Sequence, residues 1–582
     1  LLFLIAAAKA AADDYKNADD KEVRSDVEHN LAFLSVAIRL LDPKAQVQTP
    51  GQSSLMADAE MKTLQHGLHA HSNIFNDTYN YTALRSSGWR AATEKLKNFH
   101  LCYNWLSRSS FQLNESETSG DAFRRSALLY SEIERSSVGS QPALAVWKKI
   151  EAGMRLIGCP AFTGERTLFL PDFDTVFKSR GPEAKLSLSG LADPFYRTKL
   201  LLNVRRQKPV ETTAKSIFEL SSNRKSQDGG AVVFRLFTPM EEPESVWMRT
   251  EAPSQEAQGP EVPIALLALR ARGAQQASNL LGENIFKLEP ALANSVPNLI
   301  RLVKQESAAG GTQNWPWSLF GNYLKPAQEH LQIPFKTRLW MNKRLETTFA
   351  AWVDSHVALW KPQSGQVKPG PGESGSKSSG SAGTAGSPPS ATAGGAAVNF
   401  HYLEPAPDVF HQMRLQLQHQ MEALEKLGYF SSDGKSQTDD FIRLLQRFET
   451  IAVREVSAQP MFSADVSLLA NIDSVLEPIS TAVTANMWLG TSPKLGEGES
   501  GSGVAMGLGR PGELLILLRS YRGLVLLRGA SYTYYEMPGP PINVVHWNRK
   551  LEYGFLHSPF WTGDFDLPMD GLLSAPVNPA SP

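Results

Sequence analysis

The spacing of apolar residues predicts a mainly helical protein. Through most of the first 361 residues, and again over 408–456, apolar side chains recur at intervals of three and four, as on the buried face of a helix. Residues 29–43 give the clearest stripe, which Pro43 ends. We therefore expect a large multi-helical array.

Two further helices carry specific expectations. In the first, five residues follow the same spacing and should lie on a core helix: Leu96, Phe99, Cys102, Tyr103 and Leu106. In the second, Asp408 is expected to cap the N-terminus and Gly428 to stop the C-terminus, because a short acceptor side chain and a left-handed glycine suit those positions.

One segment near the C-terminus has the pattern of a β-hairpin. Within Glu513–Met537, two short apolar runs flank the polar stretch Arg519–Gly523. We expect a small antiparallel β element here, with Tyr532 and Tyr534 on one face and Tyr535 on the other. The Gly-rich residues 492–512 before it predict a loop.

A low-complexity stretch of Gly, Ser, Pro and Ala divides the chain. It cannot bury enough apolar surface to offset its ordering entropy, so residues 363–398 are predicted to be a disordered linker. It separates a helical core at 1–362 from a helical and hairpin part at 399–560, and residues 561–582 form a tail.

The first twelve residues, Leu1–Ala12, allow two interpretations. Their apolar run and small residues resemble a signal peptide, but the initiator Met and a basic n-region are missing. Their Leu and Ala content equally suits a helix, and we favour a helix in a chain truncated at its N-terminus.

Composition excludes some partners. The chain has 58 basic and 59 acidic residues and no basic stripe, which argues against nucleic-acid binding. No window of about eighteen uncharged apolar residues occurs, so no transmembrane span is expected. No cofactor is predicted.

Cysteines and sequons bear on export. Cys102 and Cys159 could form one disulfide in an exported protein, but we favour two small buried side chains. Asn76, Asn80 and Asn114 begin N-x-Ser/Thr sequons, which would make them glycosylation sites in a secreted glycoprotein.

Three histidines lie close together at His66, His69 and His71. If His66 and His69 shared a helix, their imidazoles would lie on one face and could share a metal ion. No acidic residue has matching spacing, so we favour a solvated or capping group instead.

Several blocks resemble a known family. Gly529–Met537 resembles the signature G-x-Y-S-Y-Y-E-F, His29–Pro43 resembles R-N-L-A-Y-F-x-V-A-x-x-L-L, and Val232–Ser245 resembles F-R-F-M-G-Q-R-F-x-P-D-S. Such blocks recur in order over about residues 1–555 of the chain. They are the blocks of the mainly bacterial domain of unknown function 3160 family, which has no established activity. Its members are often exported, and the resemblance implies a secretory or cell-surface setting.

The polar blocks of that family are altered here. Relatives carry histidines in R-G-H-Y and D-V-H-T. Here Trp89 stands in place of the first histidine, and the third block, Ala485–Trp488, has none. In the block resembling S-W-x-E-L-R-H-D, Asp354 stands for the glutamate, and His356 matches either the histidine, with a one-residue gap, or the arginine, without one. If the family has a site at these blocks, this chain has lost it, and we then expect Trp89, His356 and Trp488 to converge on one cleft.

These losses favour a non-catalytic interaction or structural protein, with a protein partner or self-association. Two alternatives stay open. One is a metal-assisted hydrolase that uses Asp354 and His356, and the other is an exported protein that binds carbohydrate or another ligand.

Overall fold

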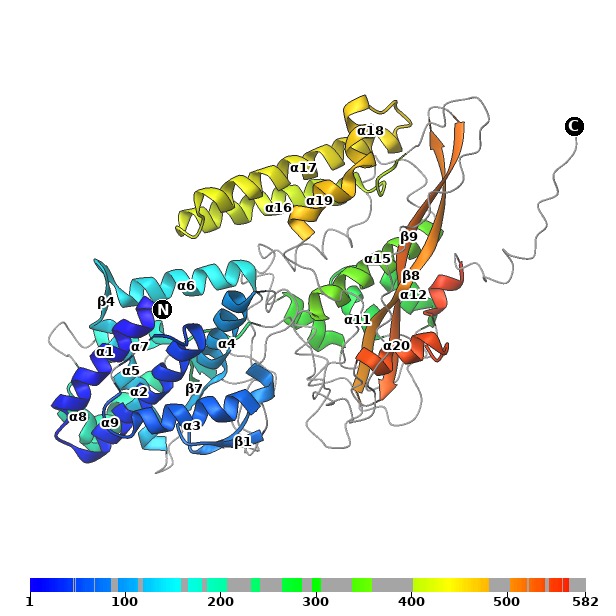
Figure 1. Ribbon diagram of the computed structural model, residues 1–582. Coiled ribbons are helices and arrows are strands. Elements are labelled where there is room, and N and C mark those ends of the chain that lie inside the picture. The colour runs from blue at the N-terminus through cyan, green and yellow to red at the C-terminus, as the bar shows by residue number, and fades with distance from the viewer. Residues whose placement is uncertain are drawn as a thin grey trace, which may run out of the picture.

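A computed structural model, shown in Figure 1, gives the architecture. It describes residues 1–45, 47, 49–66, 69–84, 93–113, 119–158, 166–179, 186–206, 232–240, 264–284, 296–304, 338–357, 401–480, 503–520, 523–539, 544–556 and 558–564. The predicted linker at 363–398 lies outside these residues. The fold is mainly helical with small sheets, which confirms the predicted class.

The N-terminal body comprises the described residues up to 240. Its central helix is α2 (Lys21–Leu41), which packs against α1 (Leu2–Asn17), α3 (Ser53–His66), α4 (Glu94–Arg108) and α5 (Ser119–Glu134). Around them lie α6 (Ala143–Ile157), α7 (Leu170–Lys178), α8 (Leu188–Ala192) and α9 (Pro194–Arg205).

Two of the helices test the apolar pattern directly. Helix α1 buries Phe3, Leu4 and four alanines, so the apolar start of the chain is a core helix. In α4 the predicted core residues Cys102, Tyr103 and Leu106 are buried, but Leu96 is exposed. Leu96 lies in the first turn of α4, whereas the buried residues of this helix begin at His100.

Short strands complete this body. Strand β7 (Val232–Phe234) is fully buried and pairs with β3 (Phe111–Gln112) in antiparallel and with β6 (Arg166–Leu168) in parallel orientation. Two small antiparallel pairs lie outside it, β1 (His69–Ser72) with β2 (Asp77–Asn80), and β4 (Ser137–Val138) with β5 (Gln141–Pro142).

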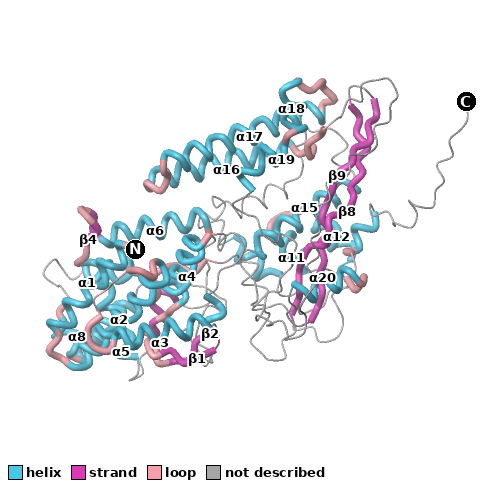
Figure 2. The backbone as a smooth tube through the Cα atoms, viewed as in Figure 1, coloured by secondary structure: helices cyan, strands magenta, loops and turns pink. Residues whose placement is uncertain are grey.

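A second hydrophobic core joins distant parts of the chain, and we call it the hairpin body. Helices α11 (Ile264–Ala271), α12 (Gln275–Asn284) and α15 (Arg338–Val357) pack with β8 (Gly503–Ser520) and β9 (Gly523–Gly539). Helix α20 (Val544–Glu552) and the 3-10 helix η6 (Phe560–Asp564) close it. Figure 2 shows the two strands as one long ribbon whose turn end extends past these helices.

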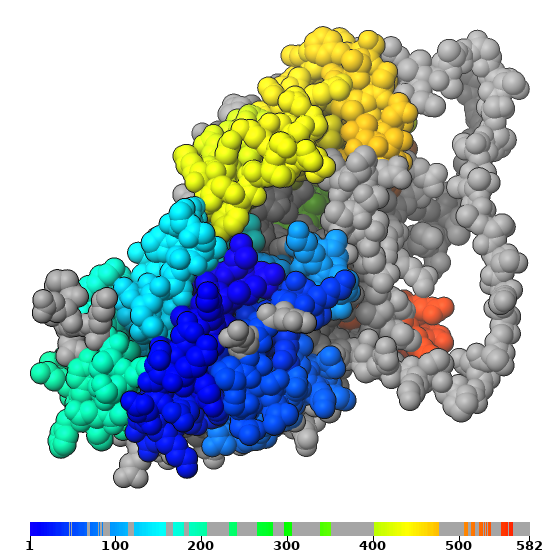
Figure 3. Space-filling view, turned by 60° about the vertical axis from the view of Figure 1, so that its left-hand side comes forward, coloured from blue at the N-terminus to red at the C-terminus, as the bar shows by residue number. Residues whose placement is uncertain are grey.

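A third cluster is an antiparallel helix pair. Helix α16 (Pro407–Lys426) lies along α17 (Ser432–Val456), followed by α18 (Ser463–Ala470) and α19 (Ile472–Ser480). Figure 3 shows this pair lying against α6, where the Gln420 side chain donates to the Leu156 carbonyl at 2.6 Å.

Of the two predictions made for the ends of α16, one is confirmed and one is wrong. Gly428 has a φ of 76° just beyond the helix, as the sequence predicts. The predicted cap at Asp408 is wrong: Ala406 precedes the helix, and Asp408 instead pairs with Arg344 at 2.8 Å. A buried guanidinium offers the carboxylate a stronger partner than the backbone amides do.

The ribbon is longer than the sequence predicts. Residues 503–512 were expected to be loop, but they form the first half of β8 and pair with Ser531–Gly539. The glycines suit this pairing, because a Cβ on Gly509 would lie 2.5 Å from Cε2 of the Tyr535 ring. The register shifts between Leu508 and Pro511, where proline cannot donate to the ladder.

Candidate functional site

The histidine cluster does not share a helix. His66 ends α3, is exposed, and its Nδ1 lies 2.6 Å from the Lys62 carbonyl oxygen, whereas His69 and His71 belong to β1. The helical geometry on which the metal hypothesis depended is therefore not formed. Within the ranges that the structure describes, no group of three His, Cys, Asp or Glu residues could hold a metal ion.

The export-related residues are only partly described. Cys102 is a buried free thiol on α4, and burial raises its pKa to about 12, while Cys159 lies outside the described residues. Asn76 is exposed in the turn between β1 and β2 with a φ of 51°. Asn80 ends β2 but its side chain is outside the description, as is all of Asn114.

The candidate catalytic pair lies at one end of α15. Asp354 and His356 belong to its last two turns, and the description covers their backbone only. Trp89 and Trp488 lie outside the described residues. The convergence of Trp89, His356 and Trp488 therefore stays a prediction.

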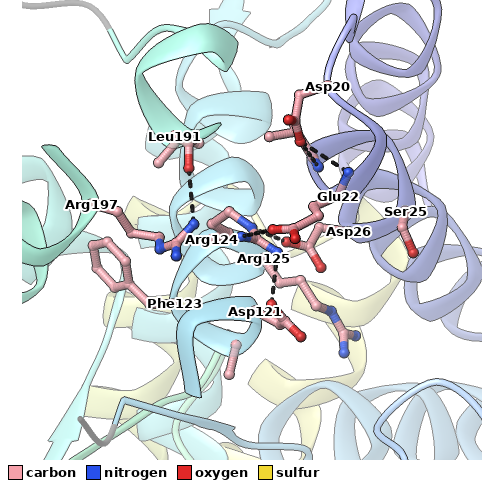
Figure 4. Close-up of polar contacts among 12 residues, drawn as sticks. Asp20, Glu22, Ser25, Asp26, Asp121, Phe123, Arg124, Arg125, Leu191 and Arg197 are labelled. Atoms are coloured by element: carbon pink, nitrogen blue, oxygen red, sulfur yellow. Dashed lines mark hydrogen bonds and ion pairs between the residues drawn. The ribbon is translucent and has the colours of Figure 1, made fainter. Parts of the chain in front are cut away.

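An ionic cluster with a buried centre joins α2 to α5, as Figure 4 shows. Arg124 donates to Asp26 at 2.6 Å, to Glu22 at 2.8 Å and to Asp121 at 2.7 Å. Arg124 and Asp26 are both buried, and burial raises the pKa of Asp26 to about 6 despite the guanidinium beside it. No pattern in the sequence predicts this cluster as a whole, although the i, i+4 spacing of Glu22 and Asp26 places both on one helix face.

Arg125, the next residue along α5, also makes buried polar contacts. The Arg125 guanidinium lies over the rings of Phe75 and Phe111, at 5.2 and 5.1 Å from their centroids, and donates to the Ile74 carbonyl at 2.8 Å. Burial lowers its pKa to about 10. Asn30 donates to the Arg125 carbonyl at 2.9 Å, so α2 and α5 are tied together at a second level.

A third set of buried polar residues in the N-terminal body consists mainly of carboxyl groups. Glu132 is fully buried, and within the described residues its carboxyl oxygens make no hydrogen bond of ordinary geometry. Burial, and then the charge of the nearby Asp14, raise its pKa well above the usual range, against the charge of Arg135 and the nearby polar side chain of Asn30. Arg135 itself donates to Asp14 at 2.5 Å. These contacts all join helices of one body, so this set has the character of an internal packing element.

A second polar network fixes the ribbon to α15. The Glu346 carboxylate accepts from the backbone N–H of Tyr534 at 3.0 Å and from Nε1 of Trp561 at 2.9 Å. The Tyr534 hydroxyl donates to Glu536 at 2.5 Å, and the same carboxylate oxygen accepts from the Ala265 amide at 2.8 Å. The base of the ribbon is thus held rigidly against α11, α15 and η6.

Aromatic stacking reinforces this junction. The Tyr534 ring stacks on Phe349 of α15 at 4.7 Å between centroids, and Phe349 stacks on Trp561 at 5.3 Å. Tyr534 is fully buried and Tyr535 only half-buried, as expected if the two lie on opposite faces, while the Tyr532 side chain is outside the description.

The turn end of the ribbon is a different kind of surface. On one face Leu515, Leu517, Leu524 and Leu526 are 40, 67, 71 and 64% exposed. The register pairs Leu517 with Leu526, and residues two apart on a strand share a face, so these four side chains form one patch. We call it the leucine face.

The reverse side of the same ribbon end is better covered. Leu514, Ile516, Val525 and Leu527 are half-buried. The continuous apolar runs in the sequence mark this region as strand. They predict burial on both faces, because a strand without alternation is normally covered on both sides. Only the structure shows that one face stays exposed.

Comparison with known proteins identifies the family. No curated protein and no solved structure matches the chain. A family model described as "Protein of unknown function (DUF3160)" matches residues 3–562, which include all three hydrophobic cores. The chain therefore belongs to this family, as its sequence blocks suggest.

Proposed function

We propose that this protein is a non-catalytic interaction protein that binds a protein partner through the leucine face. The observation that carries the proposal is the exposure of Leu515, Leu517, Leu524 and Leu526 on one face of the ribbon. Scattered exposed leucines are ordinary on protein surfaces, but a contiguous apolar patch is typical of a binding site.

The surroundings of the patch suit binding. The ribbon base is fixed by Glu346 and the Tyr534 stack, so its turn end is presented by a rigid support. A preorganised surface loses less conformational entropy on binding than a mobile one. A partner covering the leucines would remove their apolar area from water.

One substitution tests the proposal. Leu517→Asp places a charge at the centre of the leucine face and should reduce partner binding at least tenfold. Leu55→Asp is the matched control, because Leu55 is 64% exposed on α3, a helix of the N-terminal body. Native pull-down and light scattering on both full-length variants give the readout, and equal partner recovery from the two would contradict the proposal.

A second candidate function has its own observation. Tyr553 and Phe555 are 68 and 65% exposed, and their rings lie 6.1 Å apart between centroids. Exposed amphipathic rings can stack against sugars, which favours the carbohydrate-binding alternative. Tyr553→Ala with Phe555→Ala should then abolish binding of neutral oligosaccharides in calorimetric titration, and unchanged heats would contradict it.

We further propose a secretory or cell-surface setting with glycosylation at Asn76. Its exposed position in a tight turn supports this, because a glycan acceptor must be accessible. Asn76→Gln should remove one glycan mass from the secreted protein, and an identical mass for both forms would contradict the assignment.

A further inference from the structure

The turn end of the ribbon, residues 514–529, combines three properties. It presents the leucine face among nine Leu, Ile or Val residues, it is a two-stranded sheet, and its charged residues are all arginines. Each property restricts the chemistry of the partner that the proposed function requires.

The first restriction comes from the strand edges. No third strand joins β8 or β9 in the part of the chain that the structure describes. In a two-stranded ribbon, every second backbone N–H and C=O of each strand points outward from the pair. A lipid surface leaves such groups without partners in its apolar region, whereas an added peptide strand pairs with them.

The second restriction comes from charge. Residues 514–529 contain Arg519, Arg522 and Arg528 and no acidic residue. In the backbone register, Arg519 is paired with Leu524 and Arg528 with Leu515, so an arginine position adjoins each end of the leucine face. A second copy of the chain would add like charges to this stretch, whereas an acidic partner would neutralise them.

We infer that the turn end of the ribbon binds an extended segment of another protein, added as a strand, whose apolar residues are flanked by acidic ones. The inference rests on the proposed function and names the partner's chemistry. Backbone pairing at the open edge supplies affinity, the leucines contact the apolar residues, and the arginines attract the carboxylates.

Labelled peptides test this on the full-length chain. The probe is the capped peptide Glu-Val-Thr-Val-Thr-Val-Glu, with Lys-Val-Thr-Val-Thr-Val-Lys as its charge-reversed match. Fluorescence anisotropy should show the acidic peptide binding at least tenfold more tightly. Its affinity should fall as salt is raised from about 50 to 300 mM, because screening weakens the arginine contacts.

A third peptide separates strand addition from simple apolar contact. N-methylation of alternate residues of the acidic peptide removes its edge donors and should weaken binding at least tenfold. Unchanged binding of the methylated peptide, or equal binding of the acidic and basic peptides, would overturn the inference.

Variants locate the site. Leu517→Asp and the double variant Arg519→Gln/Arg528→Gln should each weaken the acidic peptide at least tenfold, while Leu55→Asp should bind like the wild type. The arginine variant keeps every leucine, so it remains informative if Leu517→Asp perturbs the ribbon. Circular dichroism checks that each variant is folded.

Two other outcomes separate this inference from the proposed function. If the wild type forms a concentration-dependent dimer that Leu517→Asp abolishes, and binds no peptide, the occupant is a second copy and only the inference fails. If vesicles of anionic lipid bind while neither peptides nor proteins do, both the inference and the proposed function fail.

Discussion

At the scale of single residues, left-handed backbone ends two long helices in the same way. Gly428 follows α16 with a φ of 76°, and Ala458 follows α17 with a φ of 52°. The Gly428 and Tyr429 amides donate to carbonyls of α16 at 2.8 and 3.0 Å, and the Ala458 and Gln459 amides do so on α17 at 3.1 and 2.8 Å. The two ends share one motif, but only one of them uses glycine.

This difference yields a reciprocal prediction. A Cβ in the left-handed region costs roughly 1–2 kcal/mol, so Ala458→Gly should raise the free energy of unfolding by about 1 kcal/mol. Gly428→Ala should lower it by a similar amount. Urea denaturation of both variants measures this, and a loss of stability in Ala458→Gly would contradict the account.

Glu455 is a second residue with a defined effect. Its carboxyl group is buried, and one oxygen accepts from the Leu403 amide at 2.9 Å while the other has no hydrogen-bond partner among the described residues. Burial raises its pKa to about 8. The folded state therefore holds a proton there that the unfolded chain releases above about pH 4.5.

The sign of the effect follows from that proton. Stability from this group is fully present below the unfolded pKa and is lost as pH rises towards about 8, by an amount on the order of 4 kcal/mol. Glu455→Gln cannot ionise, but its amide N–H lacks an acceptor, which costs roughly 1–3 kcal/mol. The variant should be more stable than the wild type at pH 8 and no more stable at pH 5. Thermal melts at both pH values decide this, and parallel pH profiles would refute it.

At the scale of elements, the junction between α15 and β9 depends on one carboxylate. Glu346 satisfies the buried Tyr534 amide and the Trp561 indole. Glu346→Ala leaves both donors unpaired, and each costs roughly 1–3 kcal/mol, so we expect a loss of about 3 kcal/mol. Glu346→Gln keeps an acceptor oxygen and should lose less.

Hydrogen exchange provides the local measurement for this junction. The Tyr534 amide should exchange at least tenfold faster in Glu346→Ala than in Glu346→Gln. Equal exchange in the two variants would show that the Glu346 carboxylate does not hold the ribbon base.

The helices and strands also show which features local sequence patterns can predict and which they cannot. Helix α2 is predicted well because its apolar stripe is local and Pro43 marks its end. The first half of β8 is missed because Gly503–Gly512 has the composition of a loop and becomes a strand only by pairing with residues 531–539. Asp408 is misassigned for a similar reason, since its partner Arg344 lies 64 residues away.

At the scale of the whole molecule, buried carboxyl groups make stability depend on pH. Burial raises the pKa of Asp26 to about 6 and also raises the pKa values of Asp14, Glu60 and Glu132. Each of these groups holds a proton in the folded state at pH values where the unfolded chain has lost it. Their contribution is complete below about pH 4 and declines as pH rises through the folded pKa values.

His29 has the opposite effect on stability. Burial lowers its pKa, so its contribution is lost as pH falls below about 6.5. The carboxyl groups outnumber it. Between pH 5.5 and 8, Asp26 loses roughly 1 kcal/mol of stabilisation and Glu455 roughly 3 kcal/mol, because most of the Asp26 effect is already lost at pH 5.5. We expect the melting temperature at pH 5.5 to exceed that at pH 8 by at least about 5 °C, as measured by calorimetry. A higher melting temperature at pH 8 would contradict this.

The sequence by itself determined the helical class, the position of the hairpin and the family, because these depend on local periodicity and ordered blocks. The tertiary structure alone decided which polar groups meet and which apolar face stays uncovered. Arg124 and Asp26 lie 98 residues apart, and Glu346 and Tyr534 lie 188 apart, so no local pattern pairs them. The leucine face likewise belongs to an apolar run that predicts burial on both sides, and its exposure depends on where the neighbouring helices end.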